Sequence, residues 1–182
     1  MQPWLPCRMH EMDYRDLIIA PIGEAVLILI AAGAGFLWHQ PLIFASLGPT
    51  AYELIETPHR RSAEPYSIFI GHLTGIASAY LSLVLTRAWW APAVSAQGVP
   101  WPRVEAVVLA AALTTFLTLL LRASQPAAIA TSLLVATGIM QAPKDAAVIM
   151  GGVVLMLLAG EPLRRVRLRY QSRQHHSQPE NS

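Results

Sequence analysis

Charged residues are scarce in this sequence. Asp, Glu, Lys and Arg together make up 13% of its 182 residues, whereas hydrophobic residues make up 54% and the mean hydropathy is +0.43. A soluble domain usually carries about 25% charged residues. The low charge content therefore excludes an ordinary soluble protein. The long apolar runs between positions 17 and 160 predict an integral membrane protein instead.

Cysteine and catalytic motifs are as scarce as charge. The one cysteine, Cys7, excludes an internal disulfide and fits no zinc-binding pattern. The sequence also lacks the G-x-S-x-G, H-E-x-x-H, P-loop and G-x-G-x-x-G motifs. We therefore expect no enzyme activity, no metal and no cofactor. An intramembrane enzyme that uses Glu24 and His72 as an acid/base pair stays a minor alternative.

Four long apolar segments and two short ones organise the chain. The long segments cover 17–38, 67–86, 103–121 and 145–163. As helices at 1.5 Å per residue, each can cross a hydrocarbon core of roughly 30 Å. The short segments, 41–56 and 126–141, are opened or interrupted by Pro and Gly. The predicted fold is an all-α polytopic membrane helical bundle with four long spans and two short helices.

The order long, short, long occurs twice, which indicates a two-fold internal repeat. Both halves begin alike, with GEAVLILIAAGAGF at 23–36 and VEAVVLAAALTTF at 104–116. Both then reach a Ser-containing Pro turn, SLGP at 46–49 and SQP at 124–126. If the short segments also cross the membrane, each half has three crossings and the second copy is inverted. If they are re-entrant, four crossings remain.

Lys and Arg residues are concentrated on one side in both topologies. The positive-inside rule then places both termini in the cytoplasm, and we expect the plasma (inner) membrane of a bacterium. The expected domains are a cytoplasmic segment over 1–16, a transmembrane domain over 17–163 and a basic, disordered tail over 164–182. The tail arginines directly follow an apolar span, so they favour the lipid bilayer over nucleic acid as their partner.

The two short segments carry the candidate binding site. A helix that begins within protein at membrane depth leaves its first N–H groups unpaired, and these groups with the helix dipole can bind an anion. Matched short helices of this kind mark the binding site of many transporters, although each can also be an ordinary kink at the interface. Pro suits the first helical turn and a Ser suits the cap position. The candidate substrate-binding residues are Ser46, Gly48, Pro49, Thr50, Ser124, Gln125, Pro126 and Thr131.

Arg122 is the candidate residue for attracting an anion. Thr114, Thr118 and Arg122 follow one another at i, i+4 and i+8, so a continuous helix would place them on one face. A guanidinium at the end of this hydroxyl stripe would suit the path of a small anion. In the alternative, the threonines bond back to their own helix and Arg122 extends to the lipid headgroups.

Two further ionisable residues lie within apolar segments. His72 lies beside a small-residue ridge, so it faces protein and either binds substrate, carries a proton or has a structural role. Glu24 lies within the first long segment, where a carboxylate is costly. Glu24 is therefore the candidate for proton coupling, unless it pairs with an Arg near the interface.

The segment ASLGPTAYELIETPHRRSAEPYSIFIGHLTG at 45–75 resembles the HPP family of integral membrane proteins. That family has a Ser-x-Gly turn, then a Pro, then a Pro leading into Gly-His. The matching residues here are Ser46, Gly48, Pro58, Pro65, Gly71 and His72. The naming motif is His-Pro-Pro with small residues and a Thr after it, shortly after an Arg. Here Gln125 replaces His and Ala127 replaces the second Pro, whereas the residues that match are Arg122, Pro126, Ala128, Ala130 and Thr131.

The resemblance covers roughly 17–163 and implies a membrane protein with four spans. Plant and cyanobacterial members of the family are associated with nitrite transport. An amide at position 125 cannot take a charge as imidazole can, although it can donate hydrogen bonds to an anion. We therefore expect a transporter or channel for a small inorganic anion. The alternative is a non-transporting membrane module that assembles with or regulates a partner protein, and the sequence leaves the oligomeric state open, a homo-oligomer included.

Overall fold

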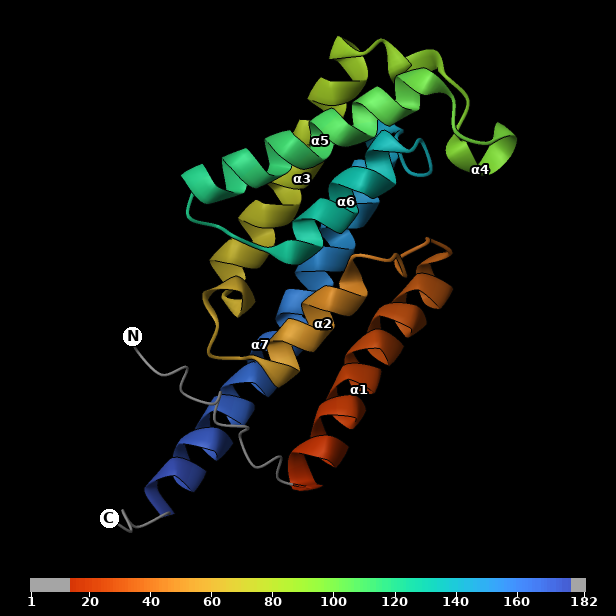
Figure 1. Ribbon diagram of the computed structural model, residues 1–182. Coiled ribbons are helices and arrows are strands. Elements are labelled where there is room, and N and C mark those ends of the chain that lie inside the picture. Colours follow the sequence, from red (N-terminus) through yellow and green to blue (C-terminus); the bar gives the residue numbers. More distant parts are fainter. Residues whose placement is uncertain (1–13, 178–182) are drawn as a thin grey trace, which may run out of the picture.

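The computed structural model describes residues 14–177, and its regular structure over that range is entirely helical (Figure 1). Two short helices, α2 (Leu47–Glu56) and α6 (Pro126–Ala136), alternate with four helices that are long and apolar enough to cross a membrane. These are α1 (Tyr14–Trp38), α3 (Pro65–Leu85), α5 (Trp101–Leu120) and α7 (Pro143–Ser177). Short turns complete the fold: η1 (Arg61–Ala63), η2 (Ala88–Trp90) and α4 (Val94–Gln97). The predicted helical membrane bundle is confirmed.

The two short helices are shorter than the sequence suggested. Helix α6 begins at Pro126 as predicted, but it ends at Ala136 because Gly138 adopts a left-handed conformation with a φ of 84°. Helix α2 begins at Leu47, and residues 41–44 are not helical. Pro41 opens this stretch and has no N–H to donate to a preceding helical turn. The chain therefore approaches α2 as an irregular segment.

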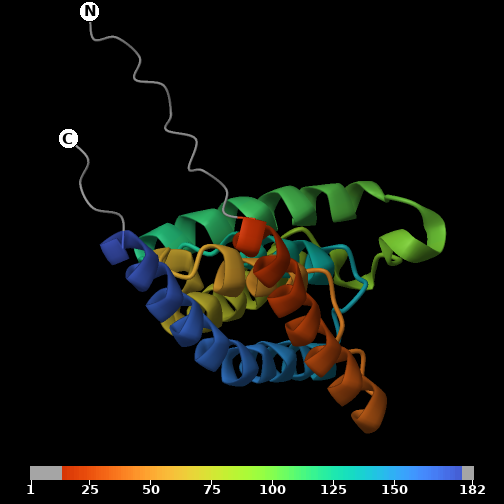
Figure 2. The same cartoon turned by 90° about the horizontal axis from the view of Figure 1, so that it is seen from below.

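The helices form two groups of three, and in each group the third helix comes from the other half of the chain. Helices α1 and α2 pack against α7 and form what we call the α1 group, whereas α5 and α6 pack against α3 and form the α5 group (Figure 1). Contacts of α3 with α7 and of α2 with α6 join the two groups. Seen from below, α5 runs along one side of the bundle and α7 along the other (Figure 2). Each group thus combines two helices of one repeat with the last helix of the other.

The direction of the chain alternates from one helix to the next. Helix α1 begins and α7 ends at the same end of the bundle, which we call the terminal end (Figure 1). Helix α2 runs back toward this end, and α6 runs away from it. Near the terminal end, the Tyr66 hydroxyl at the start of α3 donates to the Leu121 carbonyl, which follows the end of α5, at 3.3 Å. Three alternating segments per half are what an inverted repeat requires.

Helix α3 occupies the centre of the bundle and α1 its periphery. In α3, 56% of the apolar window is buried inside the protein, against 11% in α1. Gly71 and Gly75 bring α3 close to α6: a Cβ on Gly75 would lie 2.5 Å from the Ala128 carbonyl oxygen. The small-residue ridge therefore packs against a helix, as small residues at membrane helix interfaces commonly do.

Helix α7 continues past its apolar part. Residues 164–177 are helical, where the sequence suggested a disordered tail from 164, and residues 178–182 lie outside the described residues. Glu161 pairs with Arg164 at 3.2 Å and with Arg165 at 2.8 Å, spacings that stabilise a helix. Arg164 also donates to the Pro58 carbonyl, and Arg167 donates to the Ile55 carbonyl at the end of α2. These contacts with α2 and with the segment after it hold the beginning of the basic segment against the bundle.

Candidate functional site

His72 lies at the centre of a buried polar cluster between the two short helices. Its Nδ1 is 2.6 Å from Thr131 Oγ1 on α6, and its Nε2 is 3.1 Å from Thr50 Oγ1 on α2. Thr131 also donates to Ser46 Oγ at 2.8 Å, and Thr50 donates to the Ser46 carbonyl at 3.0 Å. All four side chains are fully buried. We call these four residues the His72 cluster.

Both ring nitrogens of His72 have a hydrogen-bond partner in either tautomer of the neutral imidazole. With the proton on Nδ1, the ring donates to Thr131, which donates onward to Ser46, while the Thr50 hydroxyl donates to Nε2. With the proton on Nε2, the ring donates to Thr50, which donates to the Ser46 carbonyl. Because each tautomer has a complete set of partners, the cluster can exchange hydrogen-bond direction without movement of heavy atoms.

The His72 cluster lies where the two helix groups meet. Thr50 and Ser46 belong to the α1 group, whereas His72 and Thr131 belong to the α5 group. The hydrogen bonds His72–Thr50 and Thr131–Ser46 therefore cross the interface between the groups. A relative movement of the groups has to break both of them.

A second polar group lies next to the cluster, toward the terminal end. Gln125 immediately precedes α6 and is 3% exposed, and Glu53 on α2 is 8% exposed. The side chains of Gln125 and Ser62 lie close to the Glu53 carboxyl group, and the positive charge of Arg60 also acts on this group. Gln125 packs over Gly71 of α3, where a Cβ would lie 2.7 Å from the Gln125 Cβ. Glu53 is not among the candidate residues that the sequence indicated.

The predicted helix caps differ from those observed. Ser46 occupies the N-cap position of α2 but makes no side-chain cap, because its φ and ψ are helical and its hydroxyl is engaged by Thr131. The N-cap of α6 is Gln125 rather than Ser124, and it also makes no side-chain cap. Ser124 and Pro49 are exposed, Gly48 is half-buried and Pro126 is exposed at the start of α6. Of the predicted substrate-binding residues, only Ser46, Thr50, His72 and Thr131 thus meet in the His72 cluster.

Arg122 does not continue the face that carries Thr114 and Thr118. Helix α5 ends at Leu120, and Arg122 adopts a left-handed conformation with a φ of 53°. The Arg122 N–H bonds to the Leu119 carbonyl and the next N–H bonds to the Thr118 carbonyl, which is the Schellman pattern of a helix end. Its side chain is exposed.

Thr114 and Thr118 follow the alternative weighed for them. Each is buried and donates to the carbonyl four residues earlier, at 2.7 Å. The hydrogen-bonding needs of their hydroxyls are therefore met within α5.

Glu24 is half-buried on α1, next to Gly23, which packs against Ile55 of α2.

Arg103, in the first turn of α5, is a buried cation with 1% of its surface exposed. Its guanidinium donates to the carbonyls of Ala91, Pro92 and Ala136 and to Gln141 Oε1, at 2.7–3.2 Å. The side chain of Gln141 in turn donates to the Trp89 carbonyl at 2.9 Å. Arg103 thus joins the connections that follow α3 and α6, at the end of the bundle opposite the terminal end.

Among the described residues, no group of His, Cys, Asp and Glu is suited to hold a metal ion.

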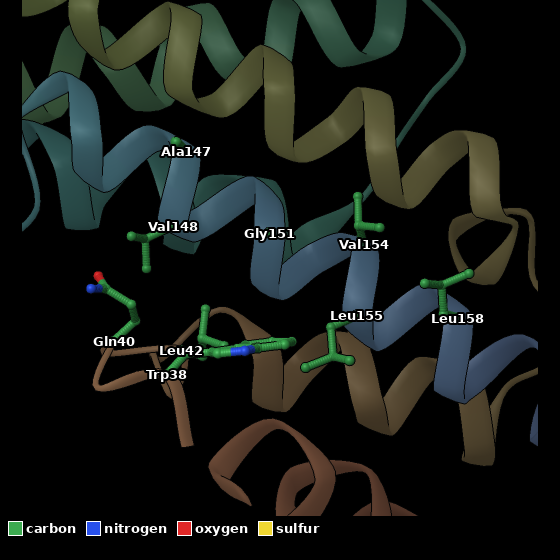
Figure 3. A pocket seen from close by; sticks show the side chains of 9 residues that line it. All are labelled: Trp38, Gln40, Leu42, Ala147, Val148, Gly151, Val154, Leu155 and Leu158. Carbon is green, nitrogen blue, oxygen red and sulfur yellow. The ribbon is translucent and has the colours of Figure 1, made fainter. Parts of the chain in front are cut away.

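An apolar groove of about 480 Å³ lies apart from the polar cluster. It is formed between Trp38 and Leu42, which flank the end of α1, and Gly151, Leu155 and Leu158 on α7 (Figure 3). No residue of the His72 cluster lines this groove. The groove is therefore not the polar cavity that an anion site between the short helices would provide.

Comparison with known families agrees with the fold. A sequence model of the HPP transmembrane region matches residues 9–171. Neither the curated proteins nor the solved structures contain a match. The match extends over most of the chain and includes both short helices and all four apolar spans. The chain belongs to the HPP family of transmembrane proteins.

Proposed function

We propose that this HPP protein transports a small inorganic anion, of the nitrite type, along the interface between the α1 group and the α5 group. The observation that supports the proposal is the bridge that His72 makes between Thr50 of one short helix and Thr131 of the other. Binding sites at the junction of inverted repeats, built from interrupted helices, are typical of secondary transporters.

The chemistry of the cluster suits a small anion. Three hydroxyls and an imidazole are grouped at the beginning of α2 and beside the first turns of α6, where backbone N–H groups point out of the helices. These donors bond to one another in the described conformation. We infer that this is a closed conformation and that separation of the two groups frees the same donors for the anion.

The exposed Arg122 would attract the anion to the entrance at the terminal end. We propose that this end faces the cytoplasm, because the Lys and Arg residues are concentrated there, and that the membrane is the plasma membrane of a bacterium. The transport cycle requires no chemical conversion of the anion. Glu24 and His72 are the residues that the sequence singles out for a coupled proton.

Anion exchange in proteoliposomes tests the proposal. Nitrite, nitrate, formate and chloride would be measured at equal pH on both sides, with protein-free liposomes as the blank. We expect saturable exchange that is lost in Thr50→Val and Thr131→Val. The matched control is Thr115→Val, since Thr115 is exposed and bonds only to its own helix.

The role of Arg122 has its own matched control. Arg122→Gln should raise the anion concentration needed for half-maximal exchange, because the attracting charge is lost. Arg87 also ends a long helix in a left-handed conformation, with a φ of 55°, but follows α3 at the opposite end of the bundle (Figure 1). Arg87→Gln should leave exchange from the terminal end unchanged.

The alternative function is a non-transporting module that binds a partner protein. The burial of the His72 cluster favours it, because the four side chains are fully buried and hydrogen-bond to one another. Absence of exchange for all four anions, with protein shown to be folded, would decide for this alternative.

A further inference from the structure

A line of polar residues on α2 leads from the His72 cluster to Glu53. Ser46, Thr50 and Glu53 are spaced at i, i+4 and i+7 and therefore share one face of the helix. At 1.5 Å per residue, Glu53 lies about 4.5 Å along the axis from Thr50. The carboxyl group is thus one turn from the cluster, on the side of the terminal end.

Four polar atoms around Glu53 are buried and make no hydrogen bond of good geometry, although the Gln125 amide lies close to the carboxyl group. They are Glu53 Oε2, Ser67 Oγ and the Oε1 and Nε2 of Gln125, within the part of the chain that the structure describes. Ser67 lies one turn before Gly71, on the face of α3 over which Gln125 packs. Unpaired buried polar atoms are costly, and several of them in one place indicate that the site takes a ligand, a water or a proton.

Charged residues lie on α2, on the segment that follows it, and on α1 and α7, which pack against α2. The titratable residue of α3 next to the site is His72, which contacts Thr50. Arg60, before η1, acts on Glu53 directly, while Glu56 follows it on α2. From α1, Glu24 is the half-buried acidic residue. From α7, the groups are Glu161 with Arg164, and Arg167, which donates to the Ile55 carbonyl. Helix α6 carries no charged residue, so Gln125 is its polar contribution.

We propose that Glu53 and Gln125 form a buried proton-binding site that couples anion transport to protons; this rests on the function proposed above. An ionised Glu53 would repel an anion at the start of α6. A protonated Glu53 is neutral and can donate to Gln125 Oε1, which turns the Gln125 NH₂ group toward the anion. One proton binds before the anion and leaves after it, so anion and proton cross together.

A metal cation fits this site less well than a proton. Glu53 is the one carboxylate among the unpaired atoms at this site, where the other groups are the Gln125 amide and the Ser67 hydroxyl. Arg60 already places a positive charge close to the carboxyl group. A proton needs one carboxyl oxygen, whereas Na⁺ or Ca²⁺ needs several oxygen ligands around it.

Proteoliposomes that contain a pH-sensitive dye test the inference. Nitrite and nitrate would be added outside at acid pH, and protein-free liposomes would correct for direct entry of the protonated acid. We expect the wild type to move protons together with the anion. Glu53→Gln should keep anion exchange at equal pH while its proton movement falls to the protein-free level. Glu105→Gln, which changes an exposed carboxylate of α5, should keep both.

The outcomes separate the inference from the function on which it rests. If the wild type exchanges anions without proton movement, the inference is wrong but the proposed anion transport is unaffected. The same conclusion follows if Glu53→Gln still moves protons together with the anion. Absence of wild-type exchange overturns the proposed function itself. A sodium gradient that replaces the pH gradient as the driving force would identify the site as a cation site and overturn the proton assignment.

A second measurement on the wild type covers the case that Glu53→Gln does not fold. A hydrophobic carbodiimide reacts with protonated carboxyl groups in apolar surroundings, and peptide mass analysis locates the modified residue. We expect modification of Glu53, with less of it when nitrite is present. Modification of Glu24 with none at Glu53 would overturn the inference.

Discussion

The Nδ1 of His72 and the Oγ1 of Thr131 lie 2.6 Å apart, although 59 positions separate the two residues in the sequence. This hydrogen bond ties α3 to α6 inside the α5 group, and the other ring nitrogen ties α3 to α2 of the α1 group. One imidazole therefore holds three helices at the junction of the two groups. Its loss should affect both stability and any movement of the groups.

His72→Ala should lower the free energy of unfolding by about 2 kcal/mol or more. The change removes two hydrogen bonds, leaves Thr50 and Thr131 without a ring partner and creates a small cavity. Thermal unfolding in detergent, followed by circular dichroism, measures the effect. His59→Ala is the control, because His59 is exposed. Equal midpoints for the two variants would contradict the structural role of His72.

Thr131→Val should cost about 1–2 kcal/mol of stability, because Val keeps the shape but removes the hydroxyl. Ser46 Oγ and His72 Nδ1 then lose a partner in a fully buried site. Thr115→Val, on the exposed face of α5, should change stability by less than about 0.5 kcal/mol. The comparison requires thermal or denaturant unfolding of both purified variants in the same detergent.

Gly75→Ala should separate α3 from α6. The new Cβ would lie 2.5 Å from the Ala128 carbonyl oxygen, and neither backbone can yield without movement of a helix. We expect a loss of about 1–3 kcal/mol. Gly33→Ala on α1 is the matched control, since a Cβ there meets nothing within 4 Å and Ala favours the helix. A stability of Gly75→Ala equal to that of Gly33→Ala would contradict the close α3–α6 contact.

Arg103→Lys should destabilise the end of the bundle opposite the terminal end, even though it keeps the charge. The planar guanidinium serves three carbonyls and Gln141 at once, and a Lys ammonium cannot reach the same set. Hydrogen exchange measured by mass spectrometry should rise in the connections over 86–100 and 137–142. Arg87→Lys, which changes an exposed residue, should leave exchange in these connections unchanged.

The apolar runs and their lengths were sufficient to predict the helical bundle, its four long spans and the two short helices. These features depend on local properties: enough consecutive apolar residues to cross a bilayer, and prolines that start or interrupt helices. The Ser-x-Gly turn and the Gly-His pair likewise indicated the HPP family, which the match over 9–171 confirms. The sequence pattern also singles out all four members of the His72 cluster as candidate residues.

The tertiary structure alone decided which of these residues meet. The exchange of α3 and α7 between the repeats brings His72 to both short helices, and no local pattern encodes that exchange. Arg122 leaves the face of Thr114 and Thr118 because α5 ends two residues earlier, in a backbone conformation that is unusual for Arg. The burial of Glu53 and Arg103 also depends on neighbours far away in the sequence. Hydrophobic periodicity is a property of one helix, whereas the surroundings of a charged side chain are set by the packing of several.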